Sequence, residues 1–352
     1  MRLGLSLGYW GSGVPAHDLI LARDADQLGY AVVWAAEAFG TDSVSVLGWL
    51  AGQTTSIDLG SAVMQIPARS PTMTAMTAAT LDLLSGGRAR IGLGVSGPQV
   101  SEGWHGVRFD APVSRTREYL DVVRLALDRK TVEYSGRHHV LPLPDGPGKA
   151  IHLTVRRVRP RIPIYLAAIG PKNLELAGEV ADGWLAIFFS PDQAETSLSR
   201  LRAGARRAGR GDESNPLADF DIVATVPVSV DDDVEVAAQR VRSYTALYVG
   251  GMGSREHNFY HALATRLGYG READIIQELF LAGEIRQAAA AVPLGLIDET
   301  ALIGPPARIQ QRMMRYRDVG VSTLTIAPYA ETLDQRRRVL HLMAGLNAAA
   351  AP

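Results

Sequence analysis

Residues 167–173 combine small residues, a glycine and a lysine in the way that an anion site requires. Their letters, AAIGPKN, follow an apolar run that is typical of a strand. Small residues let a ligand lie close to the backbone, Gly170 makes the turn, and Pro171 fits the first turn of a helix. The N–H groups of that helix and the ammonium of Lys172, one of only three lysines, attract a phosphate. The alternative is an ordinary turn with a surface lysine. The predicted phosphate-binding residues are Ala167, Ala168, Ile169, Gly170, Lys172 and Asn173.

A second glycine-rich segment, residues 92–98, ends another predicted strand. Its sequence, GLGVSGP, is similar to the fingerprint of dinucleotide-binding proteins. Pro98, however, stands where that motif needs a glycine turn into a helix, and no acidic residue follows at the required distance, so we reject a dinucleotide site. Gly94, Ser96 and Gly97 instead favour a wall of small residues against a planar ring. A tight turn that needs glycine for its geometry is the alternative.

Glu37 and residues 62–64 follow the second and third predicted strands. Glu37 ends a wholly apolar strand, so its carboxylate must find a partner or water there. It is a candidate general acid or base or a hydrogen-bond anchor, and a structural ion pair explains it equally well. Ala62, Val63 and Met64 either pack in the core or line the same ring site.

Two further polar groups follow predicted strands, Tyr9 after the first and His105 after the fourth. Together with Trp10 and Trp104 they suit a flat organic substrate, because such side chains offer an apolar body and a polar tip. Tyr9 and His105 are therefore candidate proton donors, with a structural role as the alternative for each.

Several kinds of chemistry are excluded by what the sequence lacks. The chain has no cysteine, which removes disulfides, thiolate zinc sites and cysteine nucleophiles. The histidines show no HxH or HExxH spacing, and His257 and His261 lack a carboxylate partner in the pattern, so we predict no metal. GxSxG and Walker A motifs are also missing, which argues against α/β-hydrolase and P-loop chemistry.

Short apolar runs alternate with helical patterns along most of the chain. The alternating pattern of residues 131–149 predicts a small hairpin around Ser135 and Gly136, followed by a Pro/Gly loop. The helical pattern of residues 248–303 predicts a mostly helical insertion without a strand. The predicted strands are 2–7, 30–36, 57–65, 90–95, 163–169, 183–189, 220–230 and 322–326. The predicted helices are 15–28, 43–54, 71–84, 114–128, 172–180, 191–208, 233–247, 305–317 and 332–348.

Eight strands, each followed by a helix, predict an α/β fold of the (β/α)8 TIM-like barrel class, in a single domain over residues 1–352. An open doubly wound sheet is the alternative. In such barrels the chemistry lies at the C-terminal ends of the strands, where the residues singled out above all fall. We expect the insertion 248–303 to cover the substrate side or to support assembly.

The composition of the chain argues against nucleic acid and membranes as binding partners. The chain is 47% hydrophobic and 21% charged, with a net charge of −1, so it has no strong field to attract nucleic acid or an anionic membrane. No run of about 18 apolar residues is present, and the N-terminal residues do not have the pattern of a signal peptide. We therefore expect a cytoplasmic protein that acts on small molecules.

Four segments together resemble the luciferase-like monooxygenase family, and more narrowly its F420-dependent oxidoreductase branch. They are residues 92–106 (GLGVSGPQVSEGWHG), 114–119 (SRTREY), 162–173 (IPIYLAAIGPKN) and 181–191 (ADGWLAIFFSP). The match extends through about residues 1–230 and returns near the C-terminus, and residues 248–303 match least.

The resemblance implies a barrel, usually a homodimer, that holds the deazaflavin F420 at its mouth. It implies that Glu37 contacts the ring and that Ala62 and Val63 form a strand bulge with a non-proline cis peptide, with Met64 beside them. Residues 94, 96 and 97 would lie beside the ring, and residues 167–173 would hold the phosphate.

Two departures from the family pattern limit the reaction. Sugar-phosphate dehydrogenases of this family carry an acidic residue and a histidine after the second strand, whereas this chain has Ala38 at the histidine position. They also carry a glutamate where this chain has Gly97 and Pro98. Sugar-phosphate oxidation is therefore not expected.

The resemblance implies hydride delivery from reduced F420 to an electron-poor C=C, C=N or C=O. The substrate would be a small molecule or a natural product, for example a peptide that contains a dehydroamino acid. Glu37, His105, Tyr9 or water would supply the proton. Two alternatives remain open, an FMN-dependent monooxygenase on the same barrel and a non-catalytic flavin-binding barrel.

Overall fold

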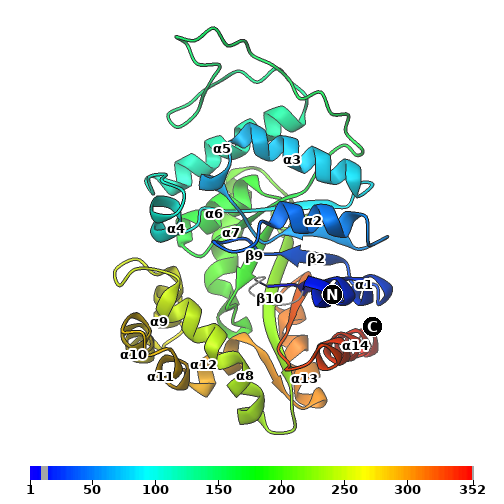
Figure 1. The fold of residues 1–352 in the computed structure, drawn as a ribbon, viewed down its shortest axis with the longest axis vertical. Helices are drawn as coiled ribbons and strands as arrows, with labels where there is room; N and C mark the ends of the chain where they lie inside the picture. Colours follow the sequence, from blue (N-terminus) through cyan, green and yellow to red (C-terminus); the bar gives the residue numbers. More distant parts are fainter. Residues whose placement is uncertain (9–14, 351–352) are drawn as a thin grey trace.

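A ring of parallel strands forms the centre of the molecule (Figure 1). The computed structural model describes residues 1–8 and 15–350. Within them the strand order is β1-β2-β3-β5-β8-β9-β10-β12, and β12 pairs again with β1, which closes the barrel and confirms the predicted fold class. The ring strands are β1 (Arg2–Ser6), β2 (Val32–Ala35), β3 (Asp58–Ser61), β5 (Ala89–Gly94), β8 (Ile164–Ala167), β9 (Gly183–Ile187), β10 (Asp221–Val230) and β12 (Thr323–Pro328).

Helices surround the ring, and most lie where the periodicity of the sequence predicts them. None of the described helices is long and apolar enough to cross a bilayer. One short helix, α4 (Pro98–Gly103), was not predicted, because six residues are too few to show a helical period. The helices that follow ring strands are α1 (Pro15–Gln27), α2 (Ser43–Ala51), α3 (Pro71–Leu84), α5 (Pro112–Leu127), α6 (Pro171–Val180), α7 (Ala194–Arg207), α8 (Val234–Ala246) and α14 (Leu333–Ala349).

The third predicted strand is interrupted. β3 ends at Ser61, and the chain resumes as β4 (Met64–Gln65), which pairs with β5. Between them the peptide bond from Ala62 to Val63 is cis, as the resemblance implies. The short 3-10 helix η1 (Ile66–Ala68) then leads into α3. The interruption lies at the C-terminal rim of the barrel, where the candidate site is expected.

The segment between β10 and β12 contains more than the predicted helical insertion. The π-helix η3 (Leu247–Gly251) and helices α9 (Phe259–Arg266), α10 (Gly270–Leu281), α11 (Ile285–Ala290) and α12 (Leu294–Thr300) pack with α8 in a second hydrophobic cluster. The prediction of no strand was wrong at its end, since β11 (Leu302–Gly304) pairs with the far end of β10. A three-residue strand leaves no alternation to read. Helix α13 (Pro306–Asp318) leads into β12, and the predicted hairpin is present as β6 (Tyr134–Ser135) and β7 (Val140–Leu141).

Two aromatic side chains fill the inside of the barrel. The rings of Trp34 on β2 and Tyr165 on β8 lie 5.2 Å apart, edge to face. Glycines make room for them, because a Cβ at Gly60 would lie 2.2 Å from the Trp34 ring and one at Gly183 would lie 2.4 Å from the Tyr165 ring. The interior is therefore packed with side chains and is not a pore.

Below these rings, at the N-terminal ends of the strands, an ionic network closes the barrel. Arg90 on β5 contacts Asp58 at 2.7 Å and Asp221 at 3.1 Å. Asp221 also accepts hydrogen bonds from the hydroxyls of Tyr165 and Thr323, at 3.0 and 2.9 Å. Burial, followed by the charge of Asp221, raises the pKa of Tyr165, so this hydroxyl stays a donor.

Adding one carbon at Gly60 should destabilise the fold, because the new Cβ would overlap the Trp34 ring. We expect Gly60→Ala to lower the free energy of unfolding by about 1–3 kcal/mol. As a control, Gly345→Ala in α14 meets no atom within 4 Å and should raise it by about 0.5–1 kcal/mol. Urea denaturation followed by circular dichroism measures both, and equal stability of Gly60→Ala and the wild type would contradict this packing.

Candidate functional site

The N-terminus of α6 is open and positively polarised. Helix α6 starts at Pro171, and no side chain in the described part of the chain caps its first N–H groups. A Cβ at Gly170 would meet no atom within 4 Å, so a ligand can approach the turn closely. Lys172 is exposed in the first turn, beside the partly buried Asn173. The residues present therefore fit a phosphate, which the helix dipole and the ammonium would both attract.

The tips of β3, β5 and β8 meet at an apolar floor. A Cβ at Gly94 would lie 2.5 Å from Cγ2 of Val63 and 3.8 Å from Cβ of Ala167, so these three predicted residues lie together. Ala62, Val63 and Ala167 pack against the cluster that contains Trp34 and Tyr165. Such a floor of small and apolar groups fits one face of a planar ring.

Met64 does not belong to this floor, which corrects its prediction as a ring contact. Its side chain is fully buried in the main core, on the face of the strand opposite Val63. The side chain of Ala168 also points away from the floor, because it is buried in the main core. Its carbonyl accepts a hydrogen bond from Nε1 of Trp184 at 2.9 Å. Gly97 is open, with no atom within 3.8 Å of a Cβ placed on it.

Gln65 joins two of the predicted site residues. Its Oε1 lies 2.7 Å from Nε2 of His105, and its Nε2 donates to the hydroxyl of Ser96 at 3.4 Å. Ser96 has a φ of 60°, a left-handed conformation that turns the chain beyond β5. The sequence analysis placed Gln65 at the end of the predicted strand 57–65 but gave it no role, although a polar residue at the tip of an apolar strand is a signal that could have identified it.

Glu37 is held in a buried ion pair. Both of its oxygens accept hydrogen bonds from Arg69, at 2.5 and 2.9 Å, and the side chain is 8% exposed. It also accepts from the backbone N–H and hydroxyl of Ser43, at 3.1 and 2.9 Å, and from the N–H of Gln65 at 3.3 Å. Burial alone lowers the pKa of Arg69, but the hydrogen bond and charge of Glu37 outweigh it and raise that pKa. The carboxylate thus ties α2, β4 and η1 together.

Five aromatic rings form a cluster that the sequence analysis missed. They come from the turn after β9, from α8, η3 and α9, and from the turn after β12, namely Phe188, Tyr244, Tyr248, Tyr260 and Tyr329. Phe188 and Tyr244 are stacked at 5.3 Å between centroids, and Tyr248 lies in the π-helix. Phe188 has a φ of 51°, which is rare for a bulky residue and typical of functional sites. The predicted residues Tyr9 and Trp10 lie outside the described residues.

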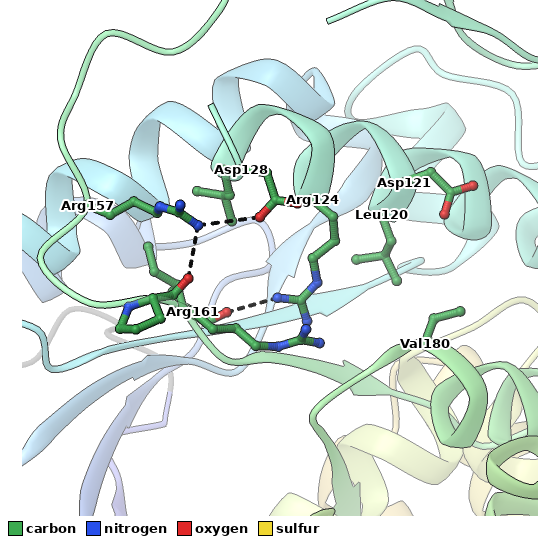
Figure 2. A pocket seen from close by; sticks show the side chains of 10 residues that line it. Leu120, Asp121, Arg124, Asp128, Arg157, Arg161 and Val180 are labelled. Atoms are coloured by element: carbon green, nitrogen blue, oxygen red, sulfur yellow. Dashed lines mark hydrogen bonds and ion pairs between the residues drawn. The ribbon is translucent and has the colours of Figure 1, made fainter. Parts of the chain in front are cut away.

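A cavity of about 390 Å³ lies at the other end of the barrel, between α5, the end of α6 and the start of β8 (Figure 2). Its guanidinium groups are all paired: Arg157 with Asp128 at 3.5 Å, Arg161 with Asp182 at 2.7 Å, and Arg124 also with Asp182. Because its charges are satisfied and it lies away from the strand tips, this cavity is not the candidate site.

No group of metal-ligating side chains occurs among residues 1–8 and 15–350. His257 and His261 show no carboxylate partner in the sequence pattern, but in the fold Nε2 of His261 lies 2.8 Å from Oδ1 of Asp274.

Comparison with known proteins shows the family of this chain. The model of the luciferase-like monooxygenase family matches residues 8–323. A Mycobacterium tuberculosis protein assigned by name to the coenzyme F420-dependent oxidoreductases is 41% identical over 331 residues, which is 93% of this chain and 94% of that protein. A 5,10-methylenetetrahydromethanopterin reductase of Archaeoglobus fulgidus is 29% identical over 302 residues, 85% of each chain.

A solved structure has the same architecture over nearly its whole length. It is the coenzyme F420-dependent tetrahydromethanopterin reductase of Methanopyrus kandleri, with a TM-score of 0.82, 25% identity, and 97% of each chain covered. The fold, the open strand tips and the family match over most of the chain all lead to one assignment. The chain belongs to the luciferase-like monooxygenase family.

Proposed function

We propose that this protein is a coenzyme F420-dependent oxidoreductase that reduces an electron-poor C=C, C=N or C=O of a small molecule or natural product, of which a peptide with a dehydroamino acid is one example. The observation that carries the proposal is the pairing of the open α6 N-terminus with the apolar floor of Val63, Gly94 and Ala167. The names of the relatives support the choice of F420 over FMN. Reduced F420 supplies the hydride in this reaction.

The residues of the chain bind the cofactor, orient the substrate and supply a proton to it. Lys172 and the N–H groups of α6 hold the phosphate, and the floor positions the ring. In this proposal the aromatic cluster lies beside the flat substrate and excludes water from it. Ser96 and Gly97 lie along one side of the ring.

His105 is our candidate for the proton donor. With the Gln65 amide oriented so that its Nε2 donates to Ser96, its Oε1 accepts the Nε2 proton of His105. The protonated imidazolium can then give its Nδ1 proton to the substrate, which leaves the neutral ring with its proton on Nε2, and Nδ1 takes up a proton from solvent for the next turnover. Glu37 acts as a positioning residue, because Arg69, Ser43 and the N–H of Gln65 occupy its oxygens.

We also propose that the protein is a homodimer through α2 and α3, which pack together (Figure 1). Trp49, Met73, Met76, Leu83 and Leu84 are 38–60% exposed on these helices. The only charged side chain of the two helices is Asp82, which is 2% exposed. An apolar face without charges can pack against a second copy of itself without repulsion.

Reversing the charge at Lys172 should weaken cofactor binding. We expect Lys172→Glu to raise the dissociation constant of F420 at least tenfold, about 1.4 kcal/mol, because an anion would then face the phosphate. The control is Lys149→Glu in the loop after the hairpin, which should bind normally. Fluorescence titration of the apoprotein with F420 and with FMN measures both. Micromolar binding of FMN without binding of F420 would overturn the F420 assignment.

Variants of His105 and Glu37 should affect different properties, the first the catalytic rate and the second the stability of the fold. We expect His105→Gln to lower kcat by a factor of about 10²–10⁴, while stability stays near wild type. Glu37→Gln should keep most of kcat but lose about 1–3 kcal/mol of stability, since Arg69 loses a charged partner. His152→Gln, at an exposed position, is the control. The opposite pattern would make Glu37 the proton donor.

Placing a charge on the α2–α3 face should separate the dimer. We expect Met76→Glu to elute as a folded monomer at micromolar concentration, whereas Leu281→Glu, which is 45% exposed in the wild type on α10, leaves the dimer intact. Light scattering after size exclusion measures the mass. A monomeric wild type, or a dimeric Met76→Glu variant, would rule out this interface.

A further inference from the structure

A cleft of about 240 Å³ lies outside the barrel at the same rim as the candidate site. We call it the α6–α9 cleft. One wall is the turn from β8 into α6, and the floor is formed by Trp184 and Ala186, which point away from the barrel interior. Helix α9 of the insertion contributes Leu263, Arg266 and Leu267. Pro171 belongs both to this cleft and to the first turn of α6, so the cleft borders the proposed phosphate site directly.

The charged groups that line this cleft are all cations. Arg200 and Arg266 line it, and no acidic side chain does. Glu175 pairs with Arg200 at 3.0 Å. Arg266 is the last residue of α9 and is exposed, and its guanidinium makes no hydrogen bond or ion pair with any described residue. In the cavity beside α5, by contrast, every guanidinium has a carboxylate partner, and Figure 2 shows one of these pairs, Arg157 with Asp128.

A buried hydroxyl in the lining also lacks a partner. Ser190, in the turn after β9, is 4% exposed, and its Oγ makes no hydrogen bond with the described residues. An unsatisfied buried polar group costs about 1–3 kcal/mol, and native proteins rarely keep one without a reason. Thr196 and Ser197 on α7 line the same cleft. A ligand with acceptor oxygens would satisfy both the serine, after rotation about χ1, and the free guanidinium.

The remaining lining restricts the ligand further. The indole N–H of Trp184 already donates to the carbonyl of Ala168, so the indole offers only apolar surface to the cleft. Leu174 and Leu263 add further apolar surface. The matching ligand therefore carries an anionic head group on a short apolar stem.

We propose that the α6–α9 cleft binds a carboxylate or phosphate group through Arg266 and Ser190. Two molecules can bring such a group: the glutamate-bearing tail of F420, which continues beyond the phosphate at α6, or a substrate that carries an acid. The anion site does not depend on the proposed function, whereas its assignment to the tail of F420 does.

The first experiment tests the site without the cofactor. Tri-γ-glutamate and inorganic phosphate are titrated into the apoprotein by calorimetry. We expect at least one of them to bind the wild type and to bind Arg266→Gln at least tenfold more weakly. The matched control is Arg271→Gln, which removes an exposed arginine from the start of α10 and should bind like wild type. Absence of binding to the wild type, or equal binding to Arg266→Gln, would overturn the proposal.

Ser190→Ala separates a binding role from a structural one. Because its Oγ makes no hydrogen bond with the described residues, removing it should leave the melting temperature unchanged or raise it. The same variant should bind the anion more weakly. A lower melting temperature together with unchanged anion binding would give Ser190 a structural role and remove it from the site.

The second experiment identifies the source of the anion. F420 with several glutamates is compared with its precursor that consists of the ring and ribityl chain alone, by fluorescence titration. If Arg266→Gln weakens F420 but not the precursor, the cleft holds the cofactor tail. If Arg266→Gln binds both F420 and the precursor like wild type, but binds tri-γ-glutamate or phosphate more weakly, the cleft binds an acidic substrate. If the wild type does not bind F420 at all, the proposed function is wrong. The calorimetric titration then still shows whether the α6–α9 cleft binds an anion.

Discussion

The filled interior of the barrel determines where a ligand can bind. Trp34 and Tyr165 occupy the inside at close range, and the ionic network around Arg90 seals the lower end. A buried ion pair of this kind adds little net stability, but leaving one partner alone is costly, so the network is retained as a unit. Only the C-terminal rim then remains for a planar cofactor, and the small residues at the tips of β3, β5 and β8 provide its floor.

The fold was predictable because its signals are local. Apolar runs and helical periods repeat along the sequence, and their alternation specifies a parallel barrel. The errors arose where an element is too short for any period, as in α4 and β11. The interruption between β3 and β4 left no trace in the apolar pattern, and the cis peptide there was implied only by the family resemblance.

The site was predictable in part, for a related reason. Parallel strands bring their tips to one rim, so Val63, Gly94 and Ala167 could be placed together from their positions alone. The partners of Glu37 and His105 could not, since Arg69 and Gln65 are 32 and 40 residues away in sequence. Met64 was misplaced because successive side chains of a strand point to opposite faces, and an unbroken apolar run does not show which face belongs to the site.

The ionic network at the base has a consequence for how this protein can change. Its members are contributed by β3, β5, β8, β10 and β12 near their first residues, far from the turns that form the rim. Substitutions in those turns leave the network untouched, so new substrate preferences can accumulate with little loss of folding. A mutagenesis library for altered specificity is therefore best confined to the turns after β5, β9 and β12 and to α9, with the first residues of the strands kept constant.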